Sequence, residues 1–302
     1  MAPARDRQHS RSRNVLVTIR AALPGLAPSE RRVAEVVLAD PTSGSAKTIS
    51  DMAEAASTSQ ATVVRFAQAL GFAGYPELRL ALAAAAAAEQ VQSVGVVPGG
   101  DVGADDDIAT VVSKIGYADS RAVQETVEQV DQETLREVVD AVLSARRVDI
   151  YGVGASSIVA LDLQMKLHRI GRVSFAWIDH HVAVPSASLL GRRDVAIGIS
   201  HSGATQDTID ALSEAQSHGA TTVAVTNFPG SAITAVADLV LTTAARETAF
   251  RSGALGSRIA ALTVVDCLFV AVAQRNLPAT ERALERTYAA VNARIGRRTR
   301  RY

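Results

Sequence analysis

The sequence predicts an all-α domain followed by an α/β domain with a five-stranded parallel sheet covered by helices on both faces. Five short apolar, β-branched runs recur after residue 147, and stretches with helical apolar spacing separate most of them. Short buried strands that alternate with helices are typical of parallel sheets. Before residue 93, apolar residues follow helical spacing instead. The length of 302 residues also fits about two domains.

Residues 15–92 are expected to form a domain of short helices. One helix starts at Pro28, with an acid in its first turn, and stops at the following Asp-Pro pair. A second helix starts at Thr48. A mostly Ala stretch, 78–88, is the last helix of this domain. The Gly- and Pro-rich residues 93–107 then predict a linker.

The middle of this domain, residues 50–69, has the proportions of a helix-turn-helix unit. Ser59 can cap the longer second helix, which ends before Gly71. The second helix of such a unit lies in the DNA major groove, and its first residues face base edges. Gln60 could pair with adenine, and Arg65 could reach phosphate or guanine. The residues predicted to face DNA are Ser59, Gln60, Ala61, Thr62 and Arg65.

Helical spacing alone leaves two functions open for this domain, which are DNA reading and docking of a partner protein. Short helical trios are common in both kinds of domain. Small polar residues begin the second helix, at a place where a packing surface would carry apolar ones. This composition favours DNA binding over docking of a partner protein.

Residues 108–296 are expected to form the α/β domain. Its strands are predicted at residues 148–153, 173–177, 194–200, 221–226 and 239–243. Its helices are predicted at residues 156–170, 205–218, 232–237, 257–273 and 278–295. Ligands of such sheets bind at the carboxyl ends of the strands, beside helix N-termini.

Two strand-to-helix loops at that edge contain candidate binding residues. Residues 200–205 read Ser-His-Ser-Gly-Ala-Thr, which brings three hydroxyls and backbone N–H groups to a helix N-terminus. This combination suits a phosphate group, whereas plain N-capping needs only one hydroxyl. Residues 152–157 read Gly-Val-Gly-Ala-Ser-Ser and lack the last glycine of a dinucleotide fingerprint. A phosphate-binding Gly-Lys-Ser/Thr sequence is also absent from the chain.

Four other polar residues are candidates for a site: His180, His181, His201 and Glu247. His180 and His181 are adjacent, so their side chains point apart on a helix or a strand, and we expect no metal and no cofactor. His201 could act as a general base, although an ordinary polar loop residue is the simpler interpretation. Glu247 follows the fifth strand within reach of a sugar hydroxyl, and an ordinary surface Glu is its alternative.

Composition and charge narrow the class of protein. Hydrophobic residues make up 48% and charged residues 21%, which suits a globular core. The single cysteine, Cys267, excludes an internal disulfide and fits a reducing compartment. We expect no membrane span, no secretory signal and a cytoplasmic protein. The net charge of zero conceals a flexible basic tail at 1–14, an acidic middle at 91–149 and a basic tail at 297–302. Basic tails attract polyanions but also serve solubility, so charge alone does not indicate DNA.

Both parts of the chain resemble the RpiR-type (MurR/RpiR) family of bacterial transcription regulators. In the first part, the similarity lies in residues 26–34, 49–53, 59–66 and 70–78, where Thr-Val-x-Arg-Phe and Leu-Gly-Phe-x-Gly are the most specific motifs. The second part resembles a sugar isomerase (SIS) domain at residues 152–156, 199–205, 226–227, 237–238, 253–254 and 257–262. Together the resemblance covers about residues 15–275.

The resemblance implies a DNA-binding regulator of carbohydrate metabolism genes that is controlled by a phosphosugar. In SIS domains, the Ser-x-Ser-Gly-x-Thr loop binds the phosphate, and further polar residues lie near the sugar. The implied effector-binding residues are Gly154, Ser156, Ser200, Ser202, Thr205 and Glu247. Ala204 stands where many relatives carry Glu, which changes the charge of the loop. No distinctive catalytic set of the isomerases matches, so we expect binding without turnover.

The implied partners are double-stranded operator DNA, a phosphosugar and further copies of the chain in a homodimer or homotetramer. Phosphosugar binding would change the relative placement of two SIS domains and thereby the spacing of two helix-turn-helix units. Two alternatives remain at this point. One is a phosphosugar isomerase or etherase with an accessory helical domain, and the other is a protein-interaction module.

Overall fold

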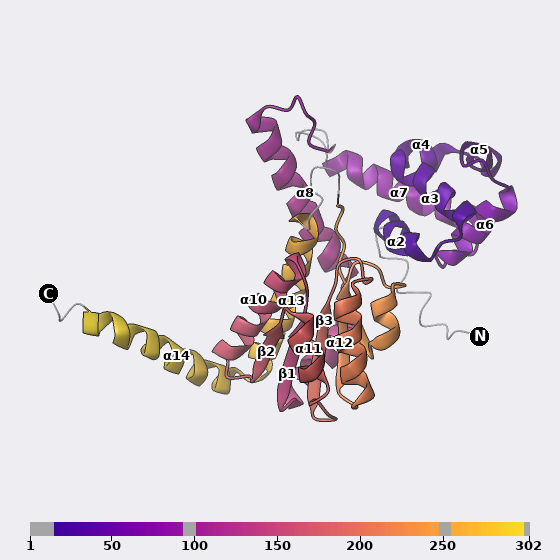
Figure 1. Cartoon of the computed structure of the whole chain (residues 1–302). Coiled ribbons are helices and arrows are strands. Elements are labelled where there is room, and N and C mark those ends of the chain that lie inside the picture. The colour runs from indigo at the N-terminus through magenta and orange to yellow at the C-terminus, as the bar shows by residue number, and fades with distance from the viewer. Residues whose placement is uncertain (1–14, 93–100, 248–254, 299–302) are drawn as a thin grey trace. The chain divides into compact units, whose positions relative to one another are not determined.

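A computed structural model describes residues 15–92, 101–247 and 255–298 of the protein. The expected tail at 1–14 and the larger part of the expected linker, 93–100, lie outside the described residues. The described chain forms two compact units, which divide after residue 129. Figure 1 shows a group of helices in the first unit and a layered sheet in the second. The domain boundaries predicted from the sequence stay a prediction.

The first unit is helical. Its elements are α2 (Val15–Ala22), η2 (Leu23–Gly25), α3 (Pro28–Ala39), α4 (Pro41–Ala46), α5 (Ile49–Ala55), α6 (Gln60–Ala69), α7 (Tyr75–Gln92) and α8 (Ile108–Gln129). Side chains from α2, α5, α6 and α7 share one core, whose largest fully buried members are Leu16, Ile19, Met52, Phe66, Leu78 and Leu82. This core fixes α5 and α6 against the other helices, so their exposed faces are held by packing.

Local capping explains where the helices of the first unit begin. At the start of α5, the Thr48 hydroxyl accepts from the Asp51 N–H at 3.2 Å and the Asp51 carboxylate accepts from the Thr48 N–H at 3.1 Å. Helix α4 was not predicted from the sequence, because Pro41 was interpreted only as the end of the preceding helix. Pro41 instead occupies the first turn of α4, and the Asp40 carboxylate caps that turn by accepting from the Ser43 N–H at 2.9 Å.

The second unit is built on a five-stranded, all-parallel sheet with the order β2-β1-β3-β4-β5. The strands are β1 (Arg147–Tyr151), β2 (Ser174–Trp177), β3 (Asp194–Ile199), β4 (Thr221–Thr226) and β5 (Leu239–Thr242). The order reverses direction between β1 and β3, and ligands of open parallel sheets bind beyond the strand ends at such a switch point. The loops that follow β1 and β3 therefore flank the expected place of a ligand.

Helices cover both faces of the sheet, as the sequence predicted (Figure 1). One face packs against α9 (Gln132–Ser144), α10 (Ala155–Arg169) and α13 (Leu255–Arg275). The other packs against α11 (His180–Ala187), α12 (Gln206–Ser217) and η3 (Ala232–Val236). The last helix, α14 (Leu277–Arg298), reaches two residues into the expected C-terminal tail. No helices were predicted from the sequence at α8, α9 and α11. The helix predicted at residues 232–237 is the 3-10 helix η3 in the structure.

One helix among the described residues, Gly256–Arg275, is long and apolar enough to cross a membrane by length and composition alone, with a mean hydropathy of 1.8. It is α13, whose Val264, Val265 and Leu268 are buried in the core between the sheet, α9 and α10. Its apolar character is therefore accounted for by its place in the core of the second unit.

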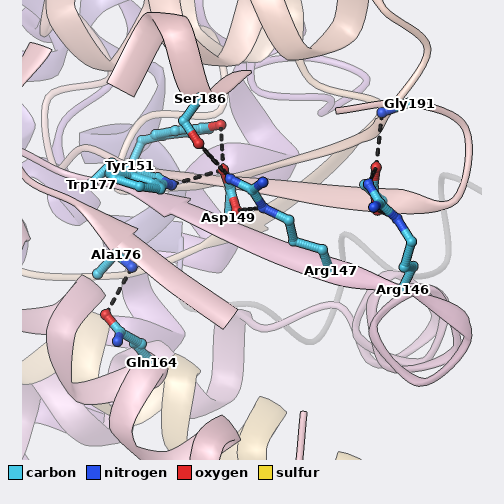
Figure 2. A network of polar contacts seen from close by, with 10 residues as sticks. Arg146, Arg147, Asp149, Tyr151, Gln164, Ala176, Trp177, Ser186 and Gly191 are labelled. Carbon is cyan, nitrogen blue, oxygen red and sulfur yellow. Dashed lines mark hydrogen bonds and ion pairs between the residues drawn. The ribbon is translucent and has the colours of Figure 1, made fainter. Parts of the chain in front are cut away.

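A buried charged network joins β1 and β2 to α11 (Figure 2). Asp149 is 0% exposed, and its carboxylate accepts from Arg147 Nε at 2.6 Å, Trp177 Nε1 at 2.7 Å and Ser186 Oγ at 2.8 Å. The Arg147 guanidinium also lies 5.0 Å from the centre of the Phe175 ring. Hydrogen bonding to the carboxylate raises the pKa of Arg147 above its ordinary value. The network ties the edge strand β2 to the centre of the sheet.

Candidate functional site

The first candidate site is the exposed surface of the helix-turn-helix formed by α5 and α6. Ser59 caps α6, and its hydroxyl accepts from the Thr62 N–H at 3.3 Å, as the sequence predicted. Four of the five predicted DNA-facing residues are exposed here: Ser59, Gln60, Ala61 and Arg65.

Thr62 differs from these four residues. It is only 3% exposed, because it lies one helical turn before Phe66 on the face that packs into the core. Its hydroxyl lies 3.1 Å from Ser59 Oγ and accepts from Arg65 Nη2 at 2.9 Å. The structure therefore gives Thr62 a supporting position beneath Ser59 and Arg65, whereas the sequence analysis placed it at the surface.

Neighbouring helices hold the two long side chains of this surface. Gln60 Nε2 donates to Ser50 Oγ on α5 at 3.0 Å, and Arg65 Nε lies 3.7 Å from Glu30 Oε1 on α3. The Gln60–Ser50 contact is exposed, and the Arg65–Glu30 pair is long and has an exposed arginine, so both are weak enough to exchange for contacts with DNA. Arg32, which the sequence analysis did not single out, donates to the carbonyl oxygen of Ala56 at 3.1 Å and thereby fixes the turn between the two helices.

The second candidate site is the loop at residues 200–205, between β3 and α12. The Ser200 hydroxyl is buried, lies 3.0 Å from Thr205 Oγ1 and accepts from the Gly203 N–H at 3.1 Å. Ser202 is exposed, and its hydroxyl accepts from the Ala204 N–H at 3.2 Å. Thr205 is the N-cap residue of α12, yet its side chain gives no cap hydrogen bond there. Ser200 therefore shapes the loop from inside, while Ser202 and the start of α12 face outward.

Glycine is needed at position 203 for a reason that differs from the predicted close approach of a ligand. Its φ is 63°, and a Cβ atom at this position would lie 1.8 Å from Ser231 Oγ. The Ile233 N–H donates to the Gly203 carbonyl at 2.9 Å, which draws the start of η3 against the loop. The sequence analysis assigned the missing side chain to close approach of a ligand. In the structure, Ser231 of the same chain takes that space.

The loop after β1 lies beside this site at the same edge of the sheet. Gly154, with a φ of 61°, is the N-cap residue of α10, and no described side chain caps that helix. At Gly152 a Cβ atom would lie 2.8 Å from the Ser156 carbonyl oxygen, so only glycine fits the turn. Ser156 follows in the first turn of α10. Two helix N-termini without a described side-chain cap, α10 and α12, thus flank the switch point of the sheet, which is an arrangement suited to an anion.

A pocket opens between these loops and the start of α13. Its polar lining residues are Ser156, His201, Thr243, Ser257 and Arg258. Its apolar lining residues are Ala155, Val159, Ile199, Val225 and Ala261. Two predicted effector residues behave differently here: Ser156 lines the pocket, whereas Glu247 lies behind the wall and accepts from the Ser257 N–H at 2.9 Å. Ser257 and Arg258 were not predicted as site residues, although residues 257–262 are among those that resemble a SIS domain, because they lie far along the chain from the hydroxyl-rich loop.

His201 is the titratable group on the pocket wall. Burial lowers the pKa of its imidazole below the ordinary value, and the nearby Glu247 carboxylate partly opposes that shift. The imidazole is therefore neutral at pH 7.

Among the described residues, no group of three or more His, Cys, Asp or Glu side chains could hold a metal ion. The rings of His180 and His181 lie 6.1 Å apart between centres at an angle of 70°, so they do not converge.

Two family profiles match the chain. The helix-turn-helix domain of the rpiR family matches residues 13–89, and the SIS domain matches residues 142–271. An uncharacterised HTH-type transcriptional regulator of Caldanaerobacter subterraneus is 35% identical over 281 residues, which are 93% of this chain and 98% of that protein. The HTH-type transcriptional regulator RpiR of Escherichia coli K12 is 32% identical over 268 residues, which are 89% of both chains.

Solved structures show the same architecture. The NanR protein of Vibrio vulnificus complexed with ManNAc-6P is 28% identical and has a TM-score of 0.57, covering 92% of this chain and 98% of that one. The sugar isomerase domain of an RpiR transcription factor from Sphaerobacter thermophilus is 24% identical and has a TM-score of 0.54, covering 58% of this chain and 97% of that one. The second similarity shows the fold of the sheet unit.

A helix-turn-helix unit joined to a SIS domain defines a transcriptional regulator, and the relatives are named as regulators and not as enzymes. The chain belongs to the RpiR family of helix-turn-helix transcriptional regulators. The predicted fold class, the predicted family and the expectation of a regulator without enzymatic activity are thereby confirmed.

Proposed function

We propose that a phosphosugar bound in the SIS domain controls how this regulator binds the operators of carbohydrate metabolism genes. One observation carries the proposal. The hydroxyl-rich loop at 200–205 and the N-termini of α10 and α12 meet beside a polar pocket at the switch point of the sheet. Backbone N–H groups at helix starts bind phosphate, and the pocket beside them lies where ligands of open parallel sheets bind.

A relative supports the choice of ligand class. The NanR structure, which covers nearly all of both chains, is a complex with the phosphosugar ManNAc-6P. For this chain, we assign the phosphate to Ser200, Ser202 and Thr205 and the sugar to the neighbourhood of Gly154, Ser156 and Glu247. Because Ser200 is buried and bonded within the loop, its role in phosphate binding is to hold the loop in shape.

The ligand must favour one arrangement of the oligomer to change DNA binding. We propose a homodimer or homotetramer in the cytoplasm, in which phosphosugar binding alters the spacing of two helix-turn-helix units. Half-sites one DNA turn apart are sensitive to that spacing. Light scattering after gel filtration, with and without phosphosugar, measures the oligomeric state. A monomer at DNA-binding concentrations would exclude this mechanism.

A thermal-shift screen of sugar phosphates tests the effector site first, because a ligand of the folded state raises the unfolding temperature. The Thr205→Ala variant should lose the shift that the unchanged chain shows. Ser217→Ala is the matched control, since its hydroxyl donates to the Glu214 carbonyl at the other end of α12. The same phosphosugar should change affinity for an operator selected from random duplexes. Unaltered operator affinity at saturating phosphosugar and fixed salt would refute control by that ligand.

DNA binding through α6 has its own test. Arg65→Ala should weaken operator binding by about 5- to 150-fold, corresponding to the roughly 1–3 kcal/mol of a specific base or phosphate contact. Arg136→Ala on α9 is the control, because its side chain is 54% exposed and that of Arg65 is 57% exposed. If both variants bind DNA like the unchanged chain, the helix-turn-helix docks a protein instead.

A further inference from the structure

Two side chains of the helical unit hold the guanidinium of Arg65 at the exposed surface of α6. The Nη2 group of Arg65 donates to Thr62 Oγ1 at 2.9 Å, one turn earlier on the same helix. Its Nε atom lies 3.7 Å from Glu30 Oε1, which belongs to the neighbouring helix α3. The side chain is nevertheless 57% exposed, and neither contact uses Nη1. Arg65 is therefore an exposed cation whose orientation is set by its neighbours.

The two side chains that hold Arg65 are themselves fixed. Thr62 is 3% exposed, and its hydroxyl also lies 3.1 Å from the Oγ atom of Ser59, the N-cap residue of α6. The Glu30 side chain is 15% exposed, and its Oε2 atom accepts from the Ala27 N–H at 3.3 Å at the start of α3. A helix N-terminus stabilises a carboxylate at this position. Because packing and capping immobilise both side chains, they restrict the directions in which the guanidinium can point.

An arginine can contact DNA in two ways, which differ in how much its orientation matters. A phosphate attracts the positive charge from many directions, and this attraction carries no sequence information. Guanine instead accepts two hydrogen bonds, at O6 and N7, which only a correctly directed planar guanidinium can donate together. Holding a long side chain in place beforehand reduces the entropy that binding costs. The restraint on Arg65 therefore benefits base reading more than phosphate binding.

Glu30 also changes the charge that Arg65 presents to DNA. A carboxylate 3.7 Å from the guanidinium offsets part of its positive charge and repels a phosphate. This neighbour weakens a phosphate contact, whereas two hydrogen bonds to a guanine edge depend mainly on direction. The Nη1 group and the second hydrogen of Nη2 are left to donate those two bonds. Charge and geometry at Arg65 thus favour the same kind of contact.

We propose that Thr62 and Glu30 are positioning residues that direct Arg65 to a guanine base and thereby set part of the operator sequence that the protein reads. The assignment rests on the proposed contact of α6 with DNA. Thr62 has the larger share, because its hydrogen bond is short and its side chain is buried. The Glu30 pair is longer and involves an exposed arginine, so it contributes less. Neither residue touches DNA in this role.

The test compares binding of the full chain to an operator selected from random duplexes and to a scrambled duplex of the same length, by fluorescence anisotropy. Thr62→Val removes the acceptor but keeps the shape, so the ratio of operator to scrambled affinity should fall by about 3- to 10-fold, as expected for losing the preorganisation of one side chain. Thr62→Ser retains the hydroxyl and should keep the ratio. Glu30→Gln should lower the ratio by about 2- to 3-fold. Glu35→Gln, which removes an exposed carboxylate from the same helix, should not change it.

Single-base changes in the operator locate the contact. The unchanged chain should lose affinity when one particular guanine is replaced, and Arg65→Ala should be insensitive to that same replacement. Thr62→Val should be less sensitive at that position and unaltered at the others. Arg65→Ala should also leave the slope of log affinity against log salt concentration nearly unchanged, because a base contact releases no counterion from a phosphate.

Several results would overturn the proposal. If Arg65→Ala weakens operator and scrambled duplex equally and reduces the salt slope by about 1, Arg65 binds a phosphate. If Thr62→Val lowers both affinities equally together with the thermal midpoint, Thr62 has only a structural role. An unchanged affinity ratio in both Thr62→Val and Glu30→Gln would also refute positioning. If Arg65→Ala leaves operator affinity unchanged, the proposed contact of α6 with DNA itself fails, and no reading residue remains to be positioned.

Discussion

Asp149 supplies the sharpest test of what stabilises the second unit, which contains the sheet. Its carboxylate is fully buried and accepts from Arg147 with both oxygens, at 2.6 and 2.7 Å, as well as from Trp177 and Ser186. The perturbation is Asp149→Ala. This variant leaves the Arg147 guanidinium without its counter-charge in a largely buried place, and it leaves the Trp177 indole N–H unpaired (Figure 2). The Ser186 hydroxyl loses its acceptor and still accepts from Arg147.

The expected loss of stability follows from these contacts. Removing one partner of a buried ion pair costs about 3–5 kcal/mol, because the remaining charge has lost its compensation. At about 2–4 °C per kcal/mol for a unit of this size, the thermal midpoint should fall by about 6–20 °C. Asp149→Asn keeps the size and two polar atoms and should cost less, about 1–3 kcal/mol.

The assay is urea unfolding followed by tryptophan fluorescence. Trp177 is the only tryptophan of the chain and belongs to the network, so its emission reports the unfolding of this unit. Asp140→Ala is the control: its carboxylate pairs with Arg275 at 3.0 Å at the surface, where an ion pair contributes little. If Asp149→Ala unfolds at the same urea concentration as Asp140→Ala, the buried network does not stabilise the unit as argued.

Three further predictions follow from other parts of the chain. Gly203→Ala should lower the thermal midpoint and abolish the increase in unfolding temperature that a sugar phosphate causes. The reason is that the φ of residue 203 is 63° and that a Cβ atom there would lie 1.8 Å from Ser231 Oγ. An unchanged increase in unfolding temperature would contradict the described loop. Burial lowers the pKa of His201 below the ordinary 6.5, so the unfolded chain binds that proton more readily and stability should fall as pH drops below about 6.5. Thermal midpoints between pH 5.5 and 7.5 measure this, and His201→Gln should flatten the dependence. Glu125→Ala removes the carboxylate that pairs with Arg20 and Arg121, and it should cost about 1–3 kcal/mol in circular-dichroism unfolding of the helical unit, unlike the exposed Glu133→Ala.

Local sequence patterns predicted the structure correctly where hydrogen bonds between nearby residues determine it. Thr48 and Ser59 cap α5 and α6 through bonds to residues three positions along the chain, so the helix-turn-helix could be located from the sequence. The burial of Thr62 was also within reach, because it precedes Phe66 by one helical turn. The sequence analysis gave more weight to its polarity than to that periodicity.

The second candidate site, at the loop 200–205 and the adjacent pocket, was only partly predictable from the sequence. The loop at 200–205 could be recognised because its hydroxyls are close in sequence and follow an apolar strand. Ser257 could not, since nothing near it in the chain indicates that its hydroxyl would be buried at a pocket opposite His201. The same applies to α11, whose place on the sheet depends on the buried network around Asp149.

The sequence by itself determined the two kinds of unit, the five strands and the capped starts of α5 and α6, because apolar periodicity and capping act over a few residues. Only the tertiary structure decided the strand order β2-β1-β3-β4-β5, and with it the edge where the loops after β1 and β3 meet the start of α13. Strand order depends on which buried faces pack together across the whole chain. Contacts of that range leave no local pattern in the sequence.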